Sequence, residues 1–183
     1  MQKKIVITII MSIYIFVLSV YAFYSITYPV KYKDIIAVES IKNNLSMSLI
    51  ASLINVESHY KKDAVSNAGA KGLMQIMPST CQYVCELNGI IFDENKLIEP
   101  EYNIKIGCLY LKYLYNKFEN TQTVLCSYNA GETIVRSWLN NSRYSSDGKS
   151  LFNVPFEETN NYLIKINKNV KYYKKIYKNM FYN

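Results

Sequence analysis

Histidine is almost absent from this chain of 183 residues, and cysteine is scarce. The only histidine is His59, and Cys81 and Cys85 are separated by four positions, which is not a usual spacing for zinc ligands. We therefore expect no metal site, and nothing in the sequence indicates another cofactor. The four cysteines, which include Cys108 and Cys126, allow two interpretations: disulfides in an exported domain, or small buried hydrophobic side chains.

Acidic residues are outnumbered, with 14 Asp and Glu against 21 Lys and Arg, for a net charge of +7. Much of the excess lies late in the chain, at Lys165, Lys168, Lys171, Lys174, Lys175 and Lys178. Such a surface attracts anionic wall polymers or lipid head groups, but the simpler interpretation is the solvated face of a last helix. No motif accompanies this charge that would indicate a nucleic-acid partner.

The chain contains no internal repeat and no low-complexity tract, and half of its residues are hydrophobic. Recurrent helical periodicity predicts a mainly α domain with a packed core. The expected helices lie near residues 33–43, 46–58, 79–88, 100–119, 121–130, 132–140 and 157–177. At most a minor β-hairpin is expected, within 60–76, and residues 140–153 form a long polar loop.

The amino-terminal segment is an almost unbroken apolar run over residues 5–28, preceded by Lys3 and Lys4. About 20 apolar residues span a bilayer, and positive charge before the span predicts that the amino terminus stays inside. We therefore predict a membrane anchor at 1–29, followed by a catalytic domain at 30–183 on the extracellular, cell-wall side of the cell membrane.

Secretion after signal cleavage is the alternative for this segment, because residues 20–22 resemble a small-residue cleavage site. The apolar run continues past that point, which favours an uncleaved, single-pass anchor. Either arrangement exports the domain, whose net charge without Lys3 and Lys4 is +5.

One carboxylate lies on an apolar helical stripe. Glu57 follows Ile50, Leu53 and Ile54 by seven, four and three residues, so these side chains share one helix face. Loss of hydration there disfavours the charged form and raises the pKa, so that a Glu can deliver a proton to a leaving oxygen near neutral pH. By periodicity alone, a Glu at a frayed helix end that points to solvent is equally compatible with the pattern.

The residues after Glu57 favour a ligand site. Ser58 could hydrogen-bond the carboxylate or a substrate, and Gly72 allows a positive φ that lets backbone approach a ligand closely. Gln75 offers donors and an acceptor suited to sugar hydroxyl and acetamido groups.

Four blocks in order resemble the soluble lytic transglycosylase family, which comprises lysozyme-like enzymes that cleave peptidoglycan. They are Glu57-Ser58; Gly72-Leu73-Met74-Gln75; Tyr128-Asn129-Ala130-Gly131, preceded by Gly107, Tyr110 and Leu111; and Val154-Pro155-Phe156-Glu157-Glu158-Thr159-Asn160-Asn161-Tyr162. Two positions depart from the family pattern: Ser127 stands where Ala is usual, and Glu132 where a second Gly is frequent. The resemblance extends from about Tyr32 to about Tyr177 and implies a lysozyme-like helical fold.

The resemblance also implies an activity: cleavage of the β-1,4 bond between N-acetylmuramic acid and N-acetylglucosamine, with formation of a 1,6-anhydromuramyl end. Glu57 would be the catalytic residue, acting first as acid and then as base. The implied substrate-binding residues are Ser58, Met74, Gln75, Tyr128, Asn129 and Tyr162. Ser58, Gln75 and Asn129 would contact sugar and acetamido groups. Met74 and Tyr128 would form groove walls, and Tyr162 would orient the Glu57 carboxylate.

No convincing second carboxylate lies near these blocks, whereas ordinary glycosidases use two. Asp63 lies in a Lys-flanked loop, and Glu157 and Glu158 begin the last helix. A lysozyme-type muramidase on the same fold remains an alternative, provided that another carboxylate approaches Glu57 in space. A non-catalytic peptidoglycan-binding assembly protein is a third possibility, against which the retention of Glu57 counts.

The partners that we expect are peptidoglycan glycan strands and, through the amino-terminal helix, the cell membrane. Small enzymes of this type often serve a secretion, conjugation or sporulation machine, and the sequence does not choose among these settings.

Overall fold

The computed structural model describes the backbone of residues 2–181 and the side chains of residues 3–178. The chain divides into two compact units, Met1–Lys31 and Tyr32–Asn183. The first unit is a single helix, α1 (Gln2–Thr27). Its stretch Lys3–Thr27 is long and apolar enough to cross a membrane, and none of its most apolar window is buried within the protein. The predicted apolar helix is therefore present, and it has the length that a bilayer requires.

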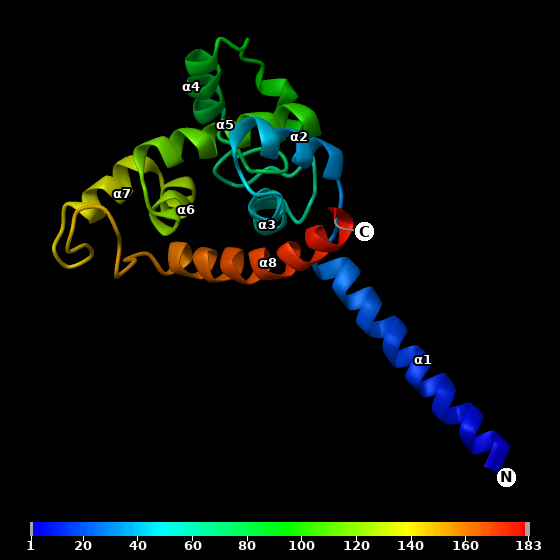
Figure 1. The fold of residues 1–183 in the computed structure, drawn as a ribbon. Helices are drawn as coiled ribbons and strands as arrows, with labels where there is room; N and C mark the ends of the chain where they lie inside the picture. Colours follow the sequence, from blue (N-terminus) through cyan, green and yellow to red (C-terminus); the bar gives the residue numbers. More distant parts are fainter. Residues whose placement is uncertain (1, 182–183) are drawn as a thin grey trace. The chain divides into compact units, whose positions relative to one another are not determined.

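The second unit is mainly helical (Figure 1). Its helices are α2 (Lys33–Asn43), α3 (Met47–Ser58), α4 (Pro78–Asn88), the short 3₁₀ helix η1 (Glu94–Ile98), α5 (Pro100–Lys117), α6 (Thr121–Ala130), α7 (Glu132–Leu139) and α8 (Glu157–Phe181). Each predicted helix is confirmed within a few residues at its ends, and η1 was not expected. Pro100 occupies the first turn of α5, where its missing N–H costs no hydrogen bond. Gly89 ends α4 in the left-handed conformation.

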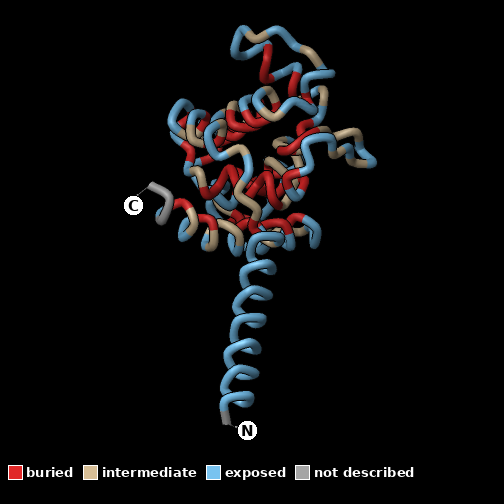
Figure 2. Tube along the Cα trace, turned by 90° about the vertical axis from the view of Figure 1, so that its right-hand side faces the viewer, coloured by how far each residue is buried: buried red, intermediate tan, exposed pale blue. Residues whose placement is uncertain are grey.

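Helix α3 is the central element of this unit. Ser46 caps its amino terminus by accepting a hydrogen bond from the Leu49 N–H. Ile50, Leu53 and Ile54 are fully buried, and burial of each such side chain contributes about 2 kcal/mol. Helix α8 packs along α3, and α2 packs against both α3 and α5. Figure 2 shows the buried segments gathered inside the helical unit, which therefore has a core of its own.

The segment 60–76 is where a minor β-hairpin was expected at most. The described residues form only isolated bridges there, between Val65 and Lys71 and between Lys71 and Ile76. This segment is a series of tight turns, with positive φ at Gly69, Gly72 and Gln75. The fold is therefore mainly α, as predicted, and turn geometry takes the place of strand pairing.

The four cysteines are free thiols, and all of them are buried. Cys81 and Cys85 are one helical turn apart on α4, with their Sγ atoms 4.0 Å apart. The sequence left open disulfides or small buried hydrophobic side chains, and the structure agrees with the second interpretation.

Candidate active site

Glu57 lies in the last turn of α3 and is half-buried. Tyr162, on α8, donates a hydrogen bond from Oη to Glu57 Oε1 over 2.7 Å. The two residues are 105 positions apart in the sequence, and the packing of α8 along α3 brings them together. Tyr162 is itself buried, so this hydrogen bond lies largely shielded from water.

The environment of Glu57 favours its protonated form. Burial raises the pKa of Glu57 from 4.5 to about 7, although the hydrogen bond from Tyr162 acts in the opposite direction. Burial, followed by the nearby Glu57 charge, also raises the pKa of Tyr162 well above 10, so this hydroxyl stays protonated and donates. Near neutral pH the Glu57 carboxyl is therefore divided between its acid and base forms, as a group that gives and then takes a proton requires.

The turn from Gly72 to Gln75 is held at the end of α3, next to Glu57 in the sequence, by hydrogen bonds that are buried or half-buried. Ser58 Oγ is 2.8 Å from the Leu73 carbonyl oxygen and 3.0 Å from the Ile54 carbonyl oxygen. Tyr128 Oη donates to the Met74 carbonyl oxygen over 2.8 Å, which ties the turn to α6. The turn thus has one attachment at the end of α3 and another on α6.

Asn103 on α5 is the third attachment of this turn, and it is fully buried. Its Oδ1 accepts from the Met74 N–H at 2.7 Å, and its Nδ2 donates to the carbonyl oxygens of Lys71 and Leu97 at 2.9 and 2.7 Å. Gly72 has φ +77°, and a Cβ there would overlap the Leu97 carbonyl oxygen and the Asn103 amide. Only glycine fits this position.

Met74 fills the space beneath the turn and is fully buried. A Cβ at Gly107 on α5 would overlap the Met74 side chain, so Gly107 provides the room that Met74 occupies. The Gly-x-x-Tyr pattern of α5 therefore has two structural roles: Gly107 admits Met74, and Tyr110 contacts Tyr128 with ring centroids 5.4 Å apart.

A cavity of about 240 Å³ opens beside the turn. Its lining residues are Gln75, Ile76, Met77, Thr80, Tyr110, Tyr128, Asn129, Ala130 and Gly131. Glu57 is not among them, but its charge contributes, after burial, to a raised pKa of Tyr128, so Tyr128 is a neighbour of both Glu57 and the cavity. Aromatic walls with a few polar groups are typical of a site that holds an organic ligand.

The polar groups of the cavity have defined hydrogen-bonding capacity. Gln75 Nε2 donates to the carbonyl oxygens of Ala64 and Gly72, so its Oε1 is left to accept from a ligand. Asn129 Oδ1 accepts from Thr159 Oγ1 at 2.7 Å, so its amide N–H groups are left to donate. One hydrogen-bond acceptor, Gln75 Oε1, and the amide N–H donors of Asn129 thus line the same cavity. This combination suits a ligand that carries hydroxyl and amide groups.

The sequence-predicted residues fall into two groups in the structure. Gln75, Tyr128 and Asn129 line the cavity, and Tyr162 bonds Glu57. Ser58 and Met74 are instead buried beneath the turn, so neither takes the surface position expected for a sugar contact or a groove wall.

Two residues of the site had been given no role from the sequence. Thr159 lies within the fourth motif block and orients Asn129. Asn103 falls on the buried stripe of α5 with Gly107 and Leu111, four and eight residues later. A polar residue on an apolar stripe is the signal that indicates such a buried anchor.

The three acidic side chains set aside from the sequence as candidates for a second carboxylate lie at the surface. Asp63, Glu157 and Glu158 are exposed. Within the described part of the chain, no group of three or more His, Cys, Asp or Glu side chains is arranged to hold a metal ion.

We expect Glu57→Gln to stabilise the isolated domain, residues 30–183, at pH 8 but not at pH 4. The folded domain binds the Glu57 proton more tightly than the unfolded chain does. The contribution of this proton to the free energy of unfolding is therefore fully present below pH 4.5 and is lost as pH rises toward 7. Urea unfolding should therefore show a gain in the free energy of unfolding at pH 8 of at most about 3 kcal/mol. The exposed Glu119→Gln is the matched control. An equal effect at both pH values would contradict the raised pKa.

We expect Asn103→Leu to lower the free energy of unfolding by about 3 kcal/mol or more. The substitution retains bulk but leaves the Met74 N–H and the Lys71 and Leu97 carbonyl oxygens without their partner, at about 1–3 kcal/mol for each buried group. Asn116→Leu, at an exposed position on the same helix, should change the free energy of unfolding by less than about 0.5 kcal/mol. Equal losses in the two variants would show that Asn103 does not anchor the turn.

Comparison with known proteins identifies the family. Residues 34–151 match the transglycosylase SLT domain family. The chain is 35% identical over 155 residues to a soluble lytic murein transglycosylase from Salmonella typhimurium, a match that covers 82% of this chain and 23% of that protein. It is 25% identical over 169 residues to a membrane-bound lytic murein transglycosylase C from Glaesserella parasuis, covering 80% of this chain and 46% of that protein.

Solved structures give the same result. A lytic transglycosylase Slt from Pseudomonas aeruginosa, solved as an inactive mutant, aligns with a TM-score of 0.75 and 28% identity over 85% of this chain and 26% of that one. The 70 kDa soluble lytic transglycosylase from Escherichia coli aligns with a TM-score of 0.72 and 30% identity over 81% of this chain and 25% of that one. The chain matches about a quarter of the length of these larger proteins. By its sequence and its fold, the chain belongs to the transglycosylase SLT domain family.

Proposed function

We propose that this protein is a peptidoglycan lytic transglycosylase held at the outer face of the cell membrane by α1. The observation that carries the proposal is that Glu57 is hydrogen-bonded to Tyr162 in a site where burial raises the Glu57 pKa to about 7. An acid with this pKa is able to protonate a leaving oxygen and then to act as a base at the same pH. Membership of the SLT domain family supplies the substrate class.

The reaction proceeds in two steps with Glu57 as the only acid–base group. Protonated Glu57 donates its proton to the oxygen that joins N-acetylmuramic acid to N-acetylglucosamine, and the bond from that oxygen to C1 of the muramic acid breaks. The acetamido group of the same sugar stabilises the positive charge at C1. The Glu57 carboxylate then removes the proton of the C6 hydroxyl, whose oxygen bonds to C1. The product carries a 1,6-anhydromuramyl end, and no water is consumed.

The hydrogen-bonding capacity of the cavity suits this substrate. The Gln75 Oε1 acceptor meets a sugar hydroxyl or an acetamide N–H, and the Asn129 N–H donors meet an acetamide carbonyl. Tyr128 supplies an aromatic wall. Ser58 and Met74, in place of direct sugar contacts, hold the turn that presents Gln75.

Anchoring by α1 is supported by the length of its apolar stretch and by a relative that is named as membrane-bound. The charge of Lys3 and Lys4 before the span favours a cytoplasmic amino terminus, which leaves the helical unit on the cell-wall side.

A lysozyme-type hydrolase would need a second carboxylate to activate water beside Glu57. The exposed positions of Asp63, Glu157 and Glu158 give no support to that alternative. A non-catalytic wall-binding protein would have no need of a buried, hydrogen-bonded acid, which is costly to the fold.

Mass spectrometry of the products released from peptidoglycan tests the proposal. Purified residues 30–183 should release muropeptides with anhydro ends. Glu57→Gln, which cannot give or take the proton, should reduce the rate by a factor of about 100 or more, while Glu119→Gln should leave it unchanged. Reducing ends in the products would contradict the transglycosylase mechanism and favour hydrolysis. Sacculus binding without release by the folded wild-type domain would favour the non-catalytic alternative.

A further inference from the structure

The exposed face of α8 carries charge of a single sign. After Glu158 the helix contains no acidic residue, and its lysines are Lys165, Lys168, Lys171, Lys174, Lys175 and Lys178. All six side chains are exposed. Among the described residues, the ion pairs involve Lys42, Lys71, Arg136 and Lys149, so no lysine of α8 is neutralised by an acid.

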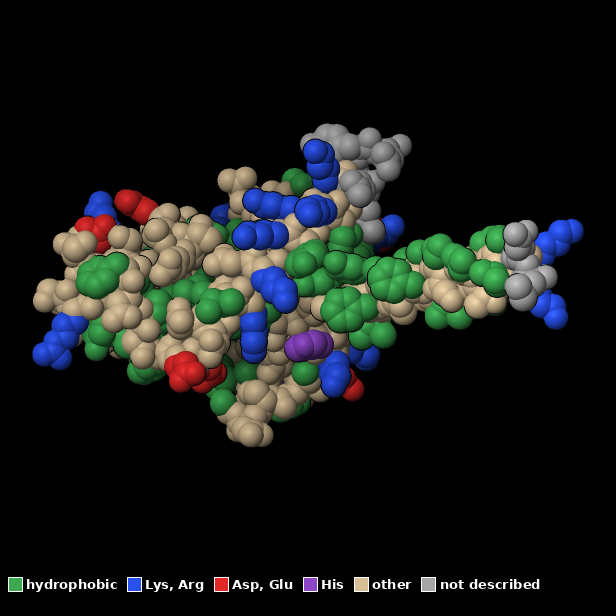
Figure 3. Space-filling model, turned by 90° about the horizontal axis from the view of Figure 1, so that it is seen from below, with side chains coloured by type: hydrophobic (Ala, Val, Ile, Leu, Met, Phe, Trp, Pro, Cys, Tyr) green, Lys and Arg blue, Asp and Glu red, His purple; other side chains and the backbone are tan. Residues whose placement is uncertain are grey.

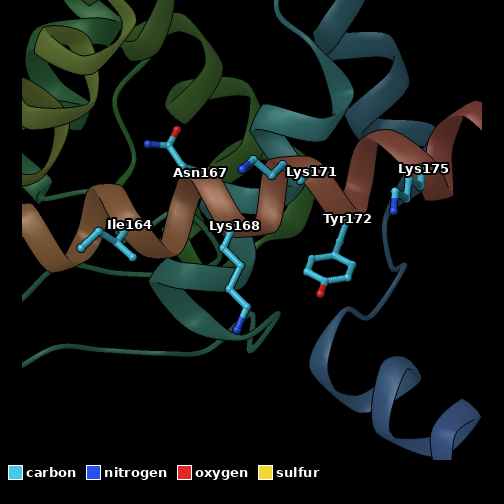
Figure 4. Close-up of a pocket in the computed structure, with 6 residues that line it drawn as sticks. All are labelled: Ile164, Asn167, Lys168, Lys171, Tyr172 and Lys175. Atoms are coloured by element: carbon cyan, nitrogen blue, oxygen red, sulfur yellow. The ribbon is translucent and has the colours of Figure 1, made fainter.

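These lysines are placed in register along the helix. Ile164, Lys168, Lys171 and Lys175 follow the spacing that puts residues on one helical face, and they help to line one shallow pocket along α8 (Figure 4). The opposite face carries Tyr162, which bonds Glu57, together with the buried part of the helix. We call the outward side, defined by Lys165, Lys168, Lys171, Lys174, Lys175 and Lys178, the basic face.

A helix face that serves only to meet water usually mixes both signs, because opposite charges one turn apart stabilise the helix. The basic face departs from that pattern. Figure 3, which views the molecule from the α8 side, shows Lys and Arg side chains grouped in the middle of the view and acidic side chains mainly toward its edge. The unpaired charge on this side is therefore suited to an anionic partner.

The length of the linker limits which anionic surface lies within reach. Five residues, 28–32, connect the end of α1 at Thr27 to the start of α2 at Lys33. They extend over at most about 20 Å, whereas a domain of this size is roughly 40 Å across. If α1 crosses the membrane, the linker keeps the near side of the domain within about 20 Å of the lipid head groups, so its faces come repeatedly within the screening length of about 10 Å.

We propose that the basic face of α8 docks on the anionic phospholipid head groups of the membrane in which α1 is anchored. The proposal rests on the membrane anchoring stated above. Lysines close to an anionic leaflet are attracted to it, and several in one row act together. Docking by this face leaves the opposite face of α8, with Tyr162 and Glu57, free of the lipid. The membrane thereby orients the active site toward glycan strands that lie next to the bilayer.

Lysine footprinting of the full-length chain tests the docking. The chain is reconstituted in nanodiscs of phosphatidylcholine alone or with phosphatidylglycerol, an amine-reactive acetylating reagent is added, and the acetylation rate of each lysine is measured by mass spectrometry. In 0.1 M salt, acetylation of Lys168, Lys171 and Lys175 should slow about threefold or more when phosphatidylglycerol is present. Lys105 and Lys112, exposed on α5, should react equally in both lipids. The protection should disappear in 1 M salt, where the screening length is about 3 Å.

A matched pair of variants separates docking from general slowing of the reagent. Lys168→Gln, Lys171→Gln and Lys175→Gln together should abolish the lipid-dependent protection of Lys165, Lys174 and Lys178. Lys105→Gln, Lys112→Gln and Lys117→Gln together remove the same charge from α5 and should preserve that protection. All six positions are exposed, so both triple variants are expected to fold.

Several outcomes would overturn the proposal. Equal acetylation of the basic face in both lipids would show that the face does not dock. Protection by soluble poly(glycerol phosphate), but not by phosphatidylglycerol, would assign the face to a wall polymer. Failure of the full-length chain to enter nanodiscs would refute the anchoring itself, which is a separate result from insertion without protection.

Discussion

The structure of the site depends on the hydrogen bond between Tyr162 and Glu57 in a partly dry environment. Water favours a charged carboxylate, so burial at the end of α3 raises the Glu57 pKa, and the Tyr162 hydroxyl prevents it from rising further. The packing of α8 along α3 supplies both, because it covers the end of α3 and also delivers the hydroxyl. The fold thus influences the protonation of the Glu57 carboxyl through one helix contact.

The turn at Gly72 to Gln75 is the second requirement, because it places the side-chain amide of Gln75 at the cavity. Its backbone adopts positive φ at both ends, and side chains on three helices hold it: the buried Ser58 and Asn103 and the half-buried Tyr128. A loop held at several points has less freedom to lose, so its donors and acceptors bind a ligand at a lower entropic cost. Several polar groups of the motif blocks therefore hold the shape of the site, and the free groups of Gln75 and Asn129 line the cavity.

Much of this arrangement could be predicted from the sequence, for physical reasons that differ between elements. Helix ends followed from Pro100, Gly89 and the apolar periodicity, which are local signals. The stripe that carries Glu57 followed from the same periodicity. The sequence could not show that Ser58 turns inward to the Leu73 carbonyl oxygen, because a hydroxyl in a motif bonds a ligand or backbone equally well. Nor could it show that Asn103 reaches a turn about 30 residues earlier, since that contact depends on how α5 packs. The sequence allowed at most a minor β-hairpin in 60–76, and the described residues there form only isolated bridges, because the left-handed turns interrupt strand pairing.

The most direct measurement is the titration of the Glu57 side-chain carboxyl by carbon-13 NMR in residues 30–183, assigned with Glu57→Gln. The wild-type pKa should be near 7, and it should be higher in Tyr162→Phe, because the lost hydrogen bond favours the charged form. Tyr115→Phe, which alters a hydroxyl on the exposed side of α5, should leave the value unchanged. A wild-type pKa near 4.5, or no rise in Tyr162→Phe, would show that burial and this hydrogen bond do not control the acid.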